Sequence, residues 1–157
     1  MTFARPMLCL FTVFAAAALT ACGPSFSYAT PHGFVELEPR DPYDYRAVTA
    51  DGLVLAAREI DHDPKGDLAF WTEVITNHLR QRGGYALLAT KPIKTAEGLA
   101  GAQLRFGHDE GSRPYLYYVT VLVTDDTIYV LEAGGTKAQV EAHAADIASA
   151  THNFRTD

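Results

Sequence analysis

Two apolar runs near the end of the chain, separated by only two acidic residues, constrain its fold most strongly. The first run covers residues 115–124, the second covers residues 127–133, and Asp125 and Asp126 lie between them. Such a short connection requires the two segments to pair as antiparallel strands. Side chains on both sides of the first run are largely apolar, so we expect both faces of the hairpin to be covered by other parts of the chain.

The other periodic segments supply strands to widen this sheet and helices to cover it. A helix is predicted between the N-cap Asp67 and the C′ residue Gly83, because apolar side chains recur every three or four residues between them. A closing helix is expected after Thr136, which has capping-box spacing to Gln139. Its predicted apolar stripe is Val140, Ala144, Ile147, Ala148 and Thr151.

Four further strands are predicted from short extended runs. They cover residues 44–49, 53–60, 85–93 and 98–106, with an Asp-Gly turn at residues 50–52 and an exposed hairpin tip at residues 107–113. The order of strands and helices predicts the α/β (α+β) class. We expect a central antiparallel sheet with helices available to cover it.

The first part of the chain is typical of a targeting signal. An apolar run at residues 7–19 follows the basic side chain of Arg5 and ends in Leu19-Thr20-Ala21-Cys22. This tetrapeptide resembles the lipobox of bacterial lipoproteins, whose signal peptidase cleaves before a lipid-bearing cysteine. The resemblance implies a cleaved signal peptide at residues 1–21 and an acylated Cys22 at the start of the mature chain. The alternative is an ordinary signal peptide that leaves Cys22 as a free thiol.

Residues 22–33 are predicted to form a lipidated tether before a folded domain at residues 34–157. The segment has no apolar period and contains several Gly, Pro and Ser residues, as flexible linkers do. Lipid on Cys22 would attach the chain to a membrane without a spanning segment. Gly23, rather than Asp, follows the cysteine, which favours the periplasmic face of the outer membrane within the bacterial cell envelope.

Charge and cysteine content exclude several classes of partner and site. The chain carries 13 Lys and Arg side chains against 19 Asp and Glu, a net charge of −6. Nucleic acid is not an expected partner, because binding the phosphate backbone requires a concentrated positive surface. One of the two cysteines, Cys9, lies in the leader, so an acylated Cys22 leaves no thiol for a disulfide, a metal or catalysis.

Several segments resemble the PsbP/DcrB-like proteins over residues 34–155. The resemblance depends on the predicted helix and on Phe154 just beyond the closing helix, together with the segments at residues 83–88, 98–106, 117–119 and 128–133. It implies a small α/β/α sandwich that acts as a binding or accessory module and is often lipidated or exported. The metal ligands of the photosystem members have no counterpart in this sequence, so no cofactor is expected.

One loop partly matches a calcium-binding pattern. Asp61, Asp63 and Gly66 fall at its positions one, three and six. Lys65 and Thr72 occupy positions five and twelve, where the pattern needs oxygen ligands and a bidentate carboxylate. We therefore favour an exposed loop that leads into the next helix.

The predicted hairpin tip is a second weak candidate for metal binding. His108, Asp109 and Glu110 supply two or three ligands, fewer than a built site needs. Solvated hairpin residues are the favoured interpretation. The remaining histidines are interpreted as scattered surface residues: His32, His62, His78, His143 and His152.

The sequence lacks a nucleophile elbow and a phosphate-binding glycine pattern, so we do not expect an enzyme. Two interpretations are open for four aromatic residues, the lining of a recognition groove or the core. The core is favoured for all four: Trp71, Tyr115, Tyr117 and Tyr118. We predict an envelope lipoprotein that is an accessory binding module for a protein or peptide partner. The alternative is a small-ligand or metal-binding protein, or a hydrolase, with a pocket built from distant polar residues: Asp61, Asp63, His108 and Glu110.

Overall fold

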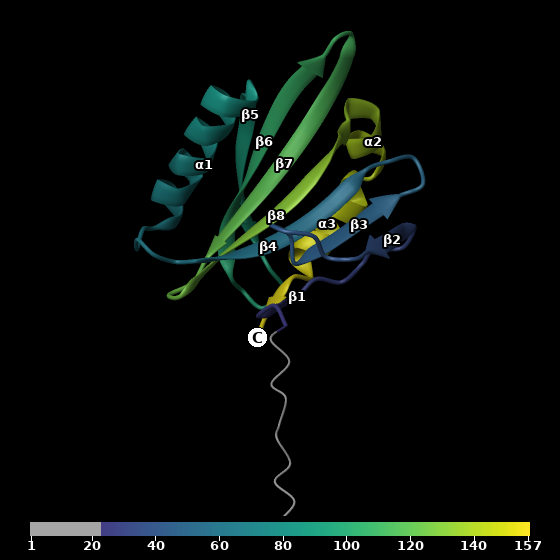
Figure 1. The fold of residues 1–157 in the computed structure, drawn as a ribbon. Coiled ribbons are helices and arrows are strands. Elements are labelled where there is room, and N and C mark those ends of the chain that lie inside the picture. The colour runs from purple at the N-terminus through teal and green to yellow at the C-terminus, as the bar shows by residue number, and fades with distance from the viewer. Residues whose placement is uncertain (1–22) are drawn as a thin grey trace, which may run out of the picture.

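The chain folds around a seven-stranded antiparallel sheet (Figure 1). This computed structural model describes residues 23–157, and the predicted signal peptide and Cys22 lie outside the described residues. Across the sheet the strands follow the order β2 (Phe34–Leu37), β3 (Tyr45–Thr49), β4 (Val54–Asp61), β8 (Thr127–Thr136), β7 (Arg113–Val123), β6 (Ala100–Glu110) and β5 (Ala86–Lys94). A two-stranded sheet pairs β1 (Phe26–Ser27) with β9 (Arg155–Thr156). The helices are α1 (Leu68–Gly83), α2 (Lys137–Ala142) and α3 (Ala144–His152).

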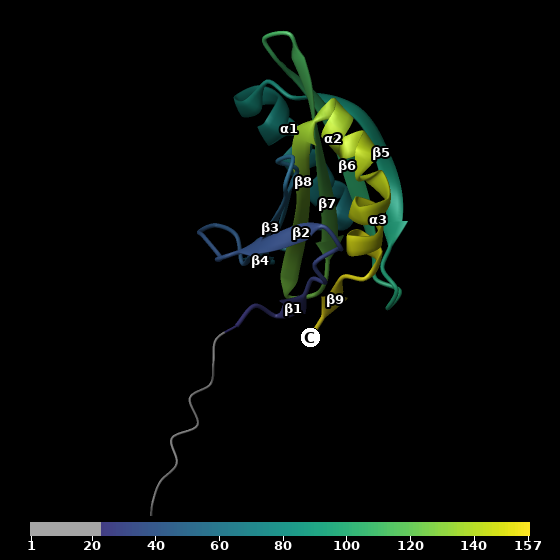
Figure 2. The same cartoon turned by 90° about the vertical axis from the view of Figure 1, so that its right-hand side faces the viewer.

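Helices cover the sheet on both sides, with α1 against one face and α2 and α3 against the other (Figure 2). We call these the α1 face and the α2/α3 face. Each face has its own cluster of buried apolar side chains. The predicted α/β/α sandwich with a central antiparallel sheet is therefore confirmed. Within residues 23–157, no helix combines the length and the apolar character needed to cross a membrane.

The predicted central hairpin is formed by β7 and β8, which pair Val123 with Ile128 across the Asp125-Asp126 turn. Alternate residues along β7 point to opposite faces, as expected for a strand. Val121 packs in the α1-face cluster and Leu122 in the α2/α3-face cluster, and both are fully buried. The expectation that both faces of this hairpin are covered is confirmed.

Helix α1 begins where the sequence predicted and ends one residue later than predicted. The Asp67 carboxylate accepts a hydrogen bond from the Phe70 N–H at 2.8 Å, which confirms the N-cap. Gly83 is the last helical residue, whereas Gly84 adopts the left-handed conformation with φ of 66°. In a Gly-Gly pair both residues tolerate this conformation, so the sequence alone did not distinguish them.

The closing helix is two short helices rather than one. The capping box at Thr136 is confirmed, since its N–H donates to Gln139 Oε1 at 2.7 Å and its hydroxyl accepts from the Gln139 N–H at 3.4 Å. The chain then turns at His143, between α2 and α3. This break rotates the predicted apolar stripe, so that Ala144 and Ala148 are exposed.

The N-terminal segment is packed into the domain, so the prediction of a tether over residues 22–33 is wrong from Ser25 onward. Phe26 and Tyr28 are buried beside Phe154, with ring centroids 5.4 and 6.0 Å from its ring. The backbone N–H and the hydroxyl of Ser25 donate to Glu59 Oε2 at 2.9 and 2.6 Å. Two aromatic residues spaced by two share one side of an extended segment, and that spacing was the signal for burial.

Candidate binding groove and buried ion pair

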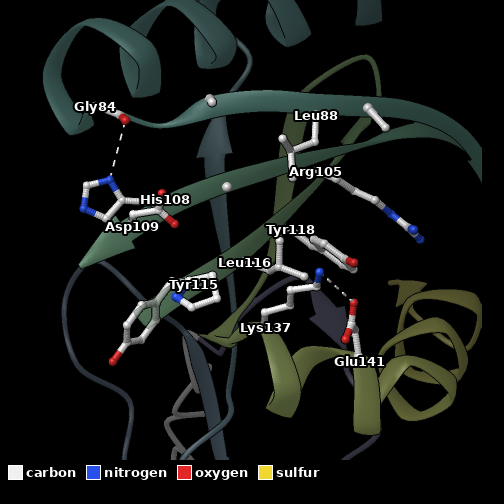
Figure 3. A pocket seen from close by; sticks show the side chains of 14 residues that line it. Gly84, Leu88, Arg105, His108, Asp109, Tyr115, Leu116, Tyr118, Lys137 and Glu141 are labelled. Carbon is white, nitrogen blue, oxygen red and sulfur yellow. Dashed lines mark hydrogen bonds and ion pairs between the residues drawn. The ribbon is translucent and has the colours of Figure 1, made fainter. Parts of the chain in front are cut away.

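A groove of about 700 Å³ lies on the α2/α3 face, where β5, β6 and β7 extend beyond the helices. Helix α2 packs on β7 and β8, which leaves this part of the sheet without a helical cover. Figure 3 shows Leu88, Arg105, Tyr118 and Lys137 around this space. The groove is therefore bounded by three strands on one side and by α2 on the other.

Leu88 lines the groove. It is unusual among the apolar residues because it is 61% exposed. The pairing of β5 with β6 shifts register between Leu87 and Ala89, so Leu88 is the extra residue of a β-bulge. A Cβ atom on Gly107 of the neighbouring strand would lie 3.1 Å from Leu88 Cδ1. The glycine thus leaves the space that the bulged leucine occupies.

Arg105 supplies a positive charge to the groove. Its guanidinium carbon lies 4.5 Å from the centroid of the Tyr118 ring, and its Nε–H donates to Gln103 Oε1 at 2.9 Å. These two contacts hold the guanidinium plane, and the bond to Gln103 uses one of its five N–H groups. Lys137 and Glu141 form an exposed ion pair at 3.8 Å on the helical rim. The arrangement can hold an apolar group and a carboxylate side by side.

On the α1 face, Glu132 forms a buried ion pair in the middle of the sheet. Its side chain is 7% exposed, its Oε1 lies 3.3 Å from Arg58 Nη2, and its Oε2 accepts from the Tyr43 hydroxyl at 2.9 Å. Burial and the nearby Glu132 carboxylate raise the pKa of Tyr117 well above its usual range, and the pKa of Tyr43 is raised by the same causes. Both tyrosines therefore keep their protons in the folded chain.

Sequence analysis did not single out Glu132, although a signal was present. Glu132 is the one charged side chain in the apolar run at residues 127–133, and it shares its strand face with Ile128 and Val130. A carboxylate at an inward position needs a partner, because burying an isolated charge is costly. The identity of the partner, Arg58, depends on the pairing of β4 with β8, which places Arg58 opposite Val130.

His62 is buried, so its interpretation as a surface residue is wrong. Nδ1 lies 2.7 Å from the Thr124 carbonyl oxygen. Nε2 lies 2.8 Å from the Gly66 carbonyl oxygen and 2.9 Å from the Gly66 backbone nitrogen. The imidazole joins the turn between β7 and β8 to the loop before α1, while Asp61 and Asp63 remain exposed on either side of it.

The four residues of the alternative pocket do not come together. Asp61 pairs with Thr127 at one end of β8, whereas Glu110 pairs with Arg113 at the far end of the β6–β7 hairpin. His108 and Asp109 line the groove, and His108 Nδ1 lies 3.5 Å from the Gly84 carbonyl. Over residues 23–157, no three His, Cys, Asp or Glu side chains are grouped closely enough to hold a metal ion.

The predicted exposed tip at residues 107–113 is shorter than expected, because β6 runs to Glu110 and β7 begins at Arg113. This extension creates the free sheet surface of the groove. Tyr115 and Tyr118 line the groove, whereas Tyr117 and Trp71 lie on the α1 face. The sequence analysis considered two places for these aromatic residues, a groove and the core. Strand β7 carries residues of both kinds.

No protein-family model and no curated protein matches this sequence. Among solved structures, LpqN, described as involved in cell envelope biogenesis of Mycobacterium tuberculosis, is similar with a TM-score of 0.69 at 12% identity, covering 84% of this chain and 83% of LpqN. The cyanobacterial PsbP of Synechocystis is similar with a TM-score of 0.62 at 10% identity, covering 85% of this chain and 87% of that protein. The chain has a PsbP-like fold.

A eukaryotic protein is also similar in structure to this chain. The Ran-binding protein Mog1p of Saccharomyces cerevisiae is similar to this chain with a TM-score of 0.57 at 12% identity, covering 84% of this chain and 90% of Mog1p. Proteins that share the PsbP-like fold at such low identity can differ in function, so function must be argued from the residues of each site.

Proposed function

We propose that this chain is a lipid-anchored accessory protein of the bacterial cell envelope that binds an extended peptide segment of another envelope protein and is not an enzyme. The observation that carries the proposal is the groove in which exposed Leu88 lies beside the Tyr118-stacked Arg105. The lipobox-like leader supports the envelope location. The similarity in fold to LpqN, a protein described as involved in envelope biogenesis, agrees with that location.

The chemistry of the groove suits a segment with an apolar side chain next to a carboxylate. Leu88 and Leu116 offer apolar surface, and Arg105 offers N–H groups that match a carboxylate. Addition of a strand at an edge of the sheet is less favourable. Edge strand β5 carries the bulge and Pro92, which has no N–H, and edge strand β2 has four residues.

Packing of Ser25 shortens the connection to the proposed lipid. Only Gly23 and Pro24 separate Cys22 from Ser25, so the anchor lies within roughly 11 Å of the folded domain. Strand β1 lies at the bottom of the domain in Figure 1, and the β6–β7 turn lies at the top. An anchored chain would therefore hold the groove away from the bilayer, on the periplasmic face of the outer membrane in our proposal.

Site-specific photocrosslinking tests the partner. A photoreactive phenylalanine at Leu88 is compared with one at Val35, an exposed residue of β2 outside the groove. We expect the Leu88 probe to capture one envelope protein, at an extended segment that contains an acidic residue, and Arg105→Glu to abolish the product. Equal capture at Val35, or a product that is insensitive to Arg105→Glu, would contradict the proposal.

Lipid anchoring is tested separately by intact mass and membrane fractionation. We expect the wild-type chain to begin at an acylated Cys22 and to sediment with outer membranes, and Cys22→Ala to lose the lipid and the attachment. Recovery of unlipidated wild-type protein away from membranes would overturn the anchor. The crosslinking result would then decide alone whether the groove binds a partner.

A further inference from the structure

A lysine lies next to Arg105 on the sheet face that forms the groove. Lys91 of β5 pairs with Gln103 of β6, and directly opposite residues of two paired strands share a face. Gln103 shares that face with Arg105, because one residue separates them along β6. Lys91 and Arg105 are therefore diagonal neighbours, with Cα atoms roughly 7–8 Å apart. Lys91 is exposed and lies just beyond the residues that line the groove.

Neither of these two cations forms an ion pair with a carboxylate of the described residues. The ion pairs within residues 23–157 involve other basic side chains: Arg58, Lys65, Lys137, His143 and Arg155. The contacts of Arg105 with Gln103 and Tyr118 are contacts with uncharged groups. Two like charges thus share one face of a chain whose net charge is −6. Charge complementarity favours an acidic partner at this place.

The side chain of Gln103 determines how a carboxylate can approach Arg105. Gln103 is 5% exposed, and its Nε2 donates to Thr120 Oγ1 at 3.3 Å, so the amide is itself held in place. Its Oε1 accepts from the Arg105 Nε–H at 2.9 Å. A carboxylate can form two parallel hydrogen bonds with Nε and one Nη of a guanidinium, or with both Nη atoms. Because the Nε–H is engaged, the two Nη atoms are left for a partner.

Along β6 from Arg105 towards the β6–β7 turn, the groove becomes apolar. Gly107 comes two residues after Arg105 and pairs with Leu116 of β7, and Leu88 of β5 lies against the same glycine. In this direction the face presents Lys91, then Arg105, then an apolar place at Gly107. Two residues of β6 separate each place from the next. Side chains on one side of an extended segment recur at the same interval, roughly 6.6 Å.

We propose that the segment bound in the groove carries two acidic residues separated by one residue, with an apolar residue two positions beyond the second. This inference rests on the proposed function of the groove. The two carboxylates bind Lys91 and the Nη atoms of Arg105, and the apolar side chain lies between Leu88 and Leu116. The reverse placement is unfavourable, because an acidic residue at the apolar end would approach Asp109, which also lines the groove.

Five-residue peptides with blocked ends test this pattern on the purified full-length chain. The two-acid probes are acetyl-Asp-Ser-Asp-Ser-Leu-amide and the same residues in reverse order, and each one-acid probe replaces the outer Asp by Asn. Binding is followed by NMR through the backbone amides of Arg105 and Leu116. In one of the two orders we expect the two-acid probe to bind about threefold more tightly than its one-acid counterpart, as an exposed ion pair allows. The difference should disappear in about 1 M salt.

Two lysines of β5 provide a matched pair of variants. Lys91→Gln should reduce the affinity of the two-acid probe to that of the one-acid probe. Lys94→Gln removes the same charge from the same strand, but Lys94 pairs with Ala100 and points to the opposite face, so the preference for two acids should persist. Both lysines are exposed, so the spectra should show that both variants remain folded.

The outcomes separate this inference from the proposed function. A two-acid probe that binds no more tightly than its one-acid counterpart in either order would overturn the inference, whereas the binding of both would still support a peptide-binding groove. A preference that survives Lys91→Gln, or that Lys94→Gln removes equally, would overturn the role of Lys91. If no probe shifts the amides of Arg105 and Leu116 saturably, the proposed peptide-binding function of the groove is overturned as well.

Discussion

On the α2/α3 face the ring of Phe154 packs against Phe26, Tyr28 and Tyr129 and fills the space between helix and sheet, whereas on the α1 face a cavity remains under the helix. Buried residues of α2 and α3 include Val140 and Ile147, but α1 has none that is fully buried. Both helical layers cover apolar strands of the same sheet. They therefore differ in how completely they exclude water and other molecules.

The difference follows from the number of segments that contribute to each face. The filled face combines two helices with the N-terminal strand and the C-terminal residues, so side chains from distant parts of the chain interlock. The α1 face has a single helix over an ion pair and its tyrosine partner. The space directly under α2 and α3 is therefore closely packed, whereas a cavity of about 220 Å³ remains under α1.

The largest effect is predicted for a side-chain truncation on the α2/α3 face, which we compare with a truncation on the α1 face. Phe154 is 1% exposed, so Phe154→Ala should lower the free energy of unfolding by about 3–5 kcal/mol. Ile75 is half-buried beside the cavity, and Ile75→Ala should cost below about 2 kcal/mol. Urea-induced unfolding measures both values. Equal losses would show that the two faces are packed equally well.

A second prediction concerns the ion pair on the less tightly packed face. Arg58→Met leaves the Glu132 carboxylate buried without a cation, and should cost roughly 2–3 kcal/mol because Arg58 is partly solvated. The double variant Arg58→Met, Glu132→Leu should recover at least half of that loss, since no charge remains buried. A double variant less stable than either single variant would contradict this account.

The third prediction uses one tyrosine from each face. Burial raises the pKa of Tyr28 and of Tyr117 above the ordinary 10.0, so the folded chain retains protons that the unfolded chain releases. Stability should be full below pH 10 and fall above it, by about 1.4 kcal/mol per pH unit for each tyrosine. Urea unfolding at several alkaline pH values should show a smaller slope for Tyr28→Phe and for Tyr117→Phe. A variant whose slope matches the wild-type slope would show that its tyrosine does not contribute to the loss of stability at alkaline pH.

The smallest effect is expected at the helix caps. Asp67→Ala removes the N-cap of α1 and Thr136→Ala removes that of α2, and each should cost about 1 kcal/mol. Hydrogen exchange should increase through α1 in Asp67→Ala, because few tertiary contacts hold that helix in place. The matched control Asp67→Asn should retain the cap. Exchange that rises equally in all three helices would contradict a locally weak α1.

The central hairpin and α1 were predictable because their signals are local. Asp125-Asp126 between two apolar runs determines an antiparallel pair, and the spacing of Leu68, Trp71, Ile75 and Leu79 determines which side of the helix faces the sheet. Such patterns depend on residues that are neighbours along the chain. The break at His143 was missed because the capping box and apolar spacing were compatible with one continuous helix.

The candidate sites were less predictable because each combines distant segments. The groove depends on a bulge at Leu88 that faces Gly107, and on α2, which follows β8. The polar residues chosen from local patterns, such as Asp61 and Glu110, lie at separate ends of the sheet. Residues that share a site need not share a motif, and strand register decides which of them meet.

The sequence by itself determined an antiparallel sheet with helices to cover it, the central strand pair and the cap of α1, because hydrophobic period and turn chemistry act over a few residues. Only the tertiary structure decided that Phe26 and Tyr28 belong to the core and that Glu132 pairs with Arg58. These outcomes depend on contacts between residues far apart in the chain, whose free energy appears only when the strands are in register and the helices are in place.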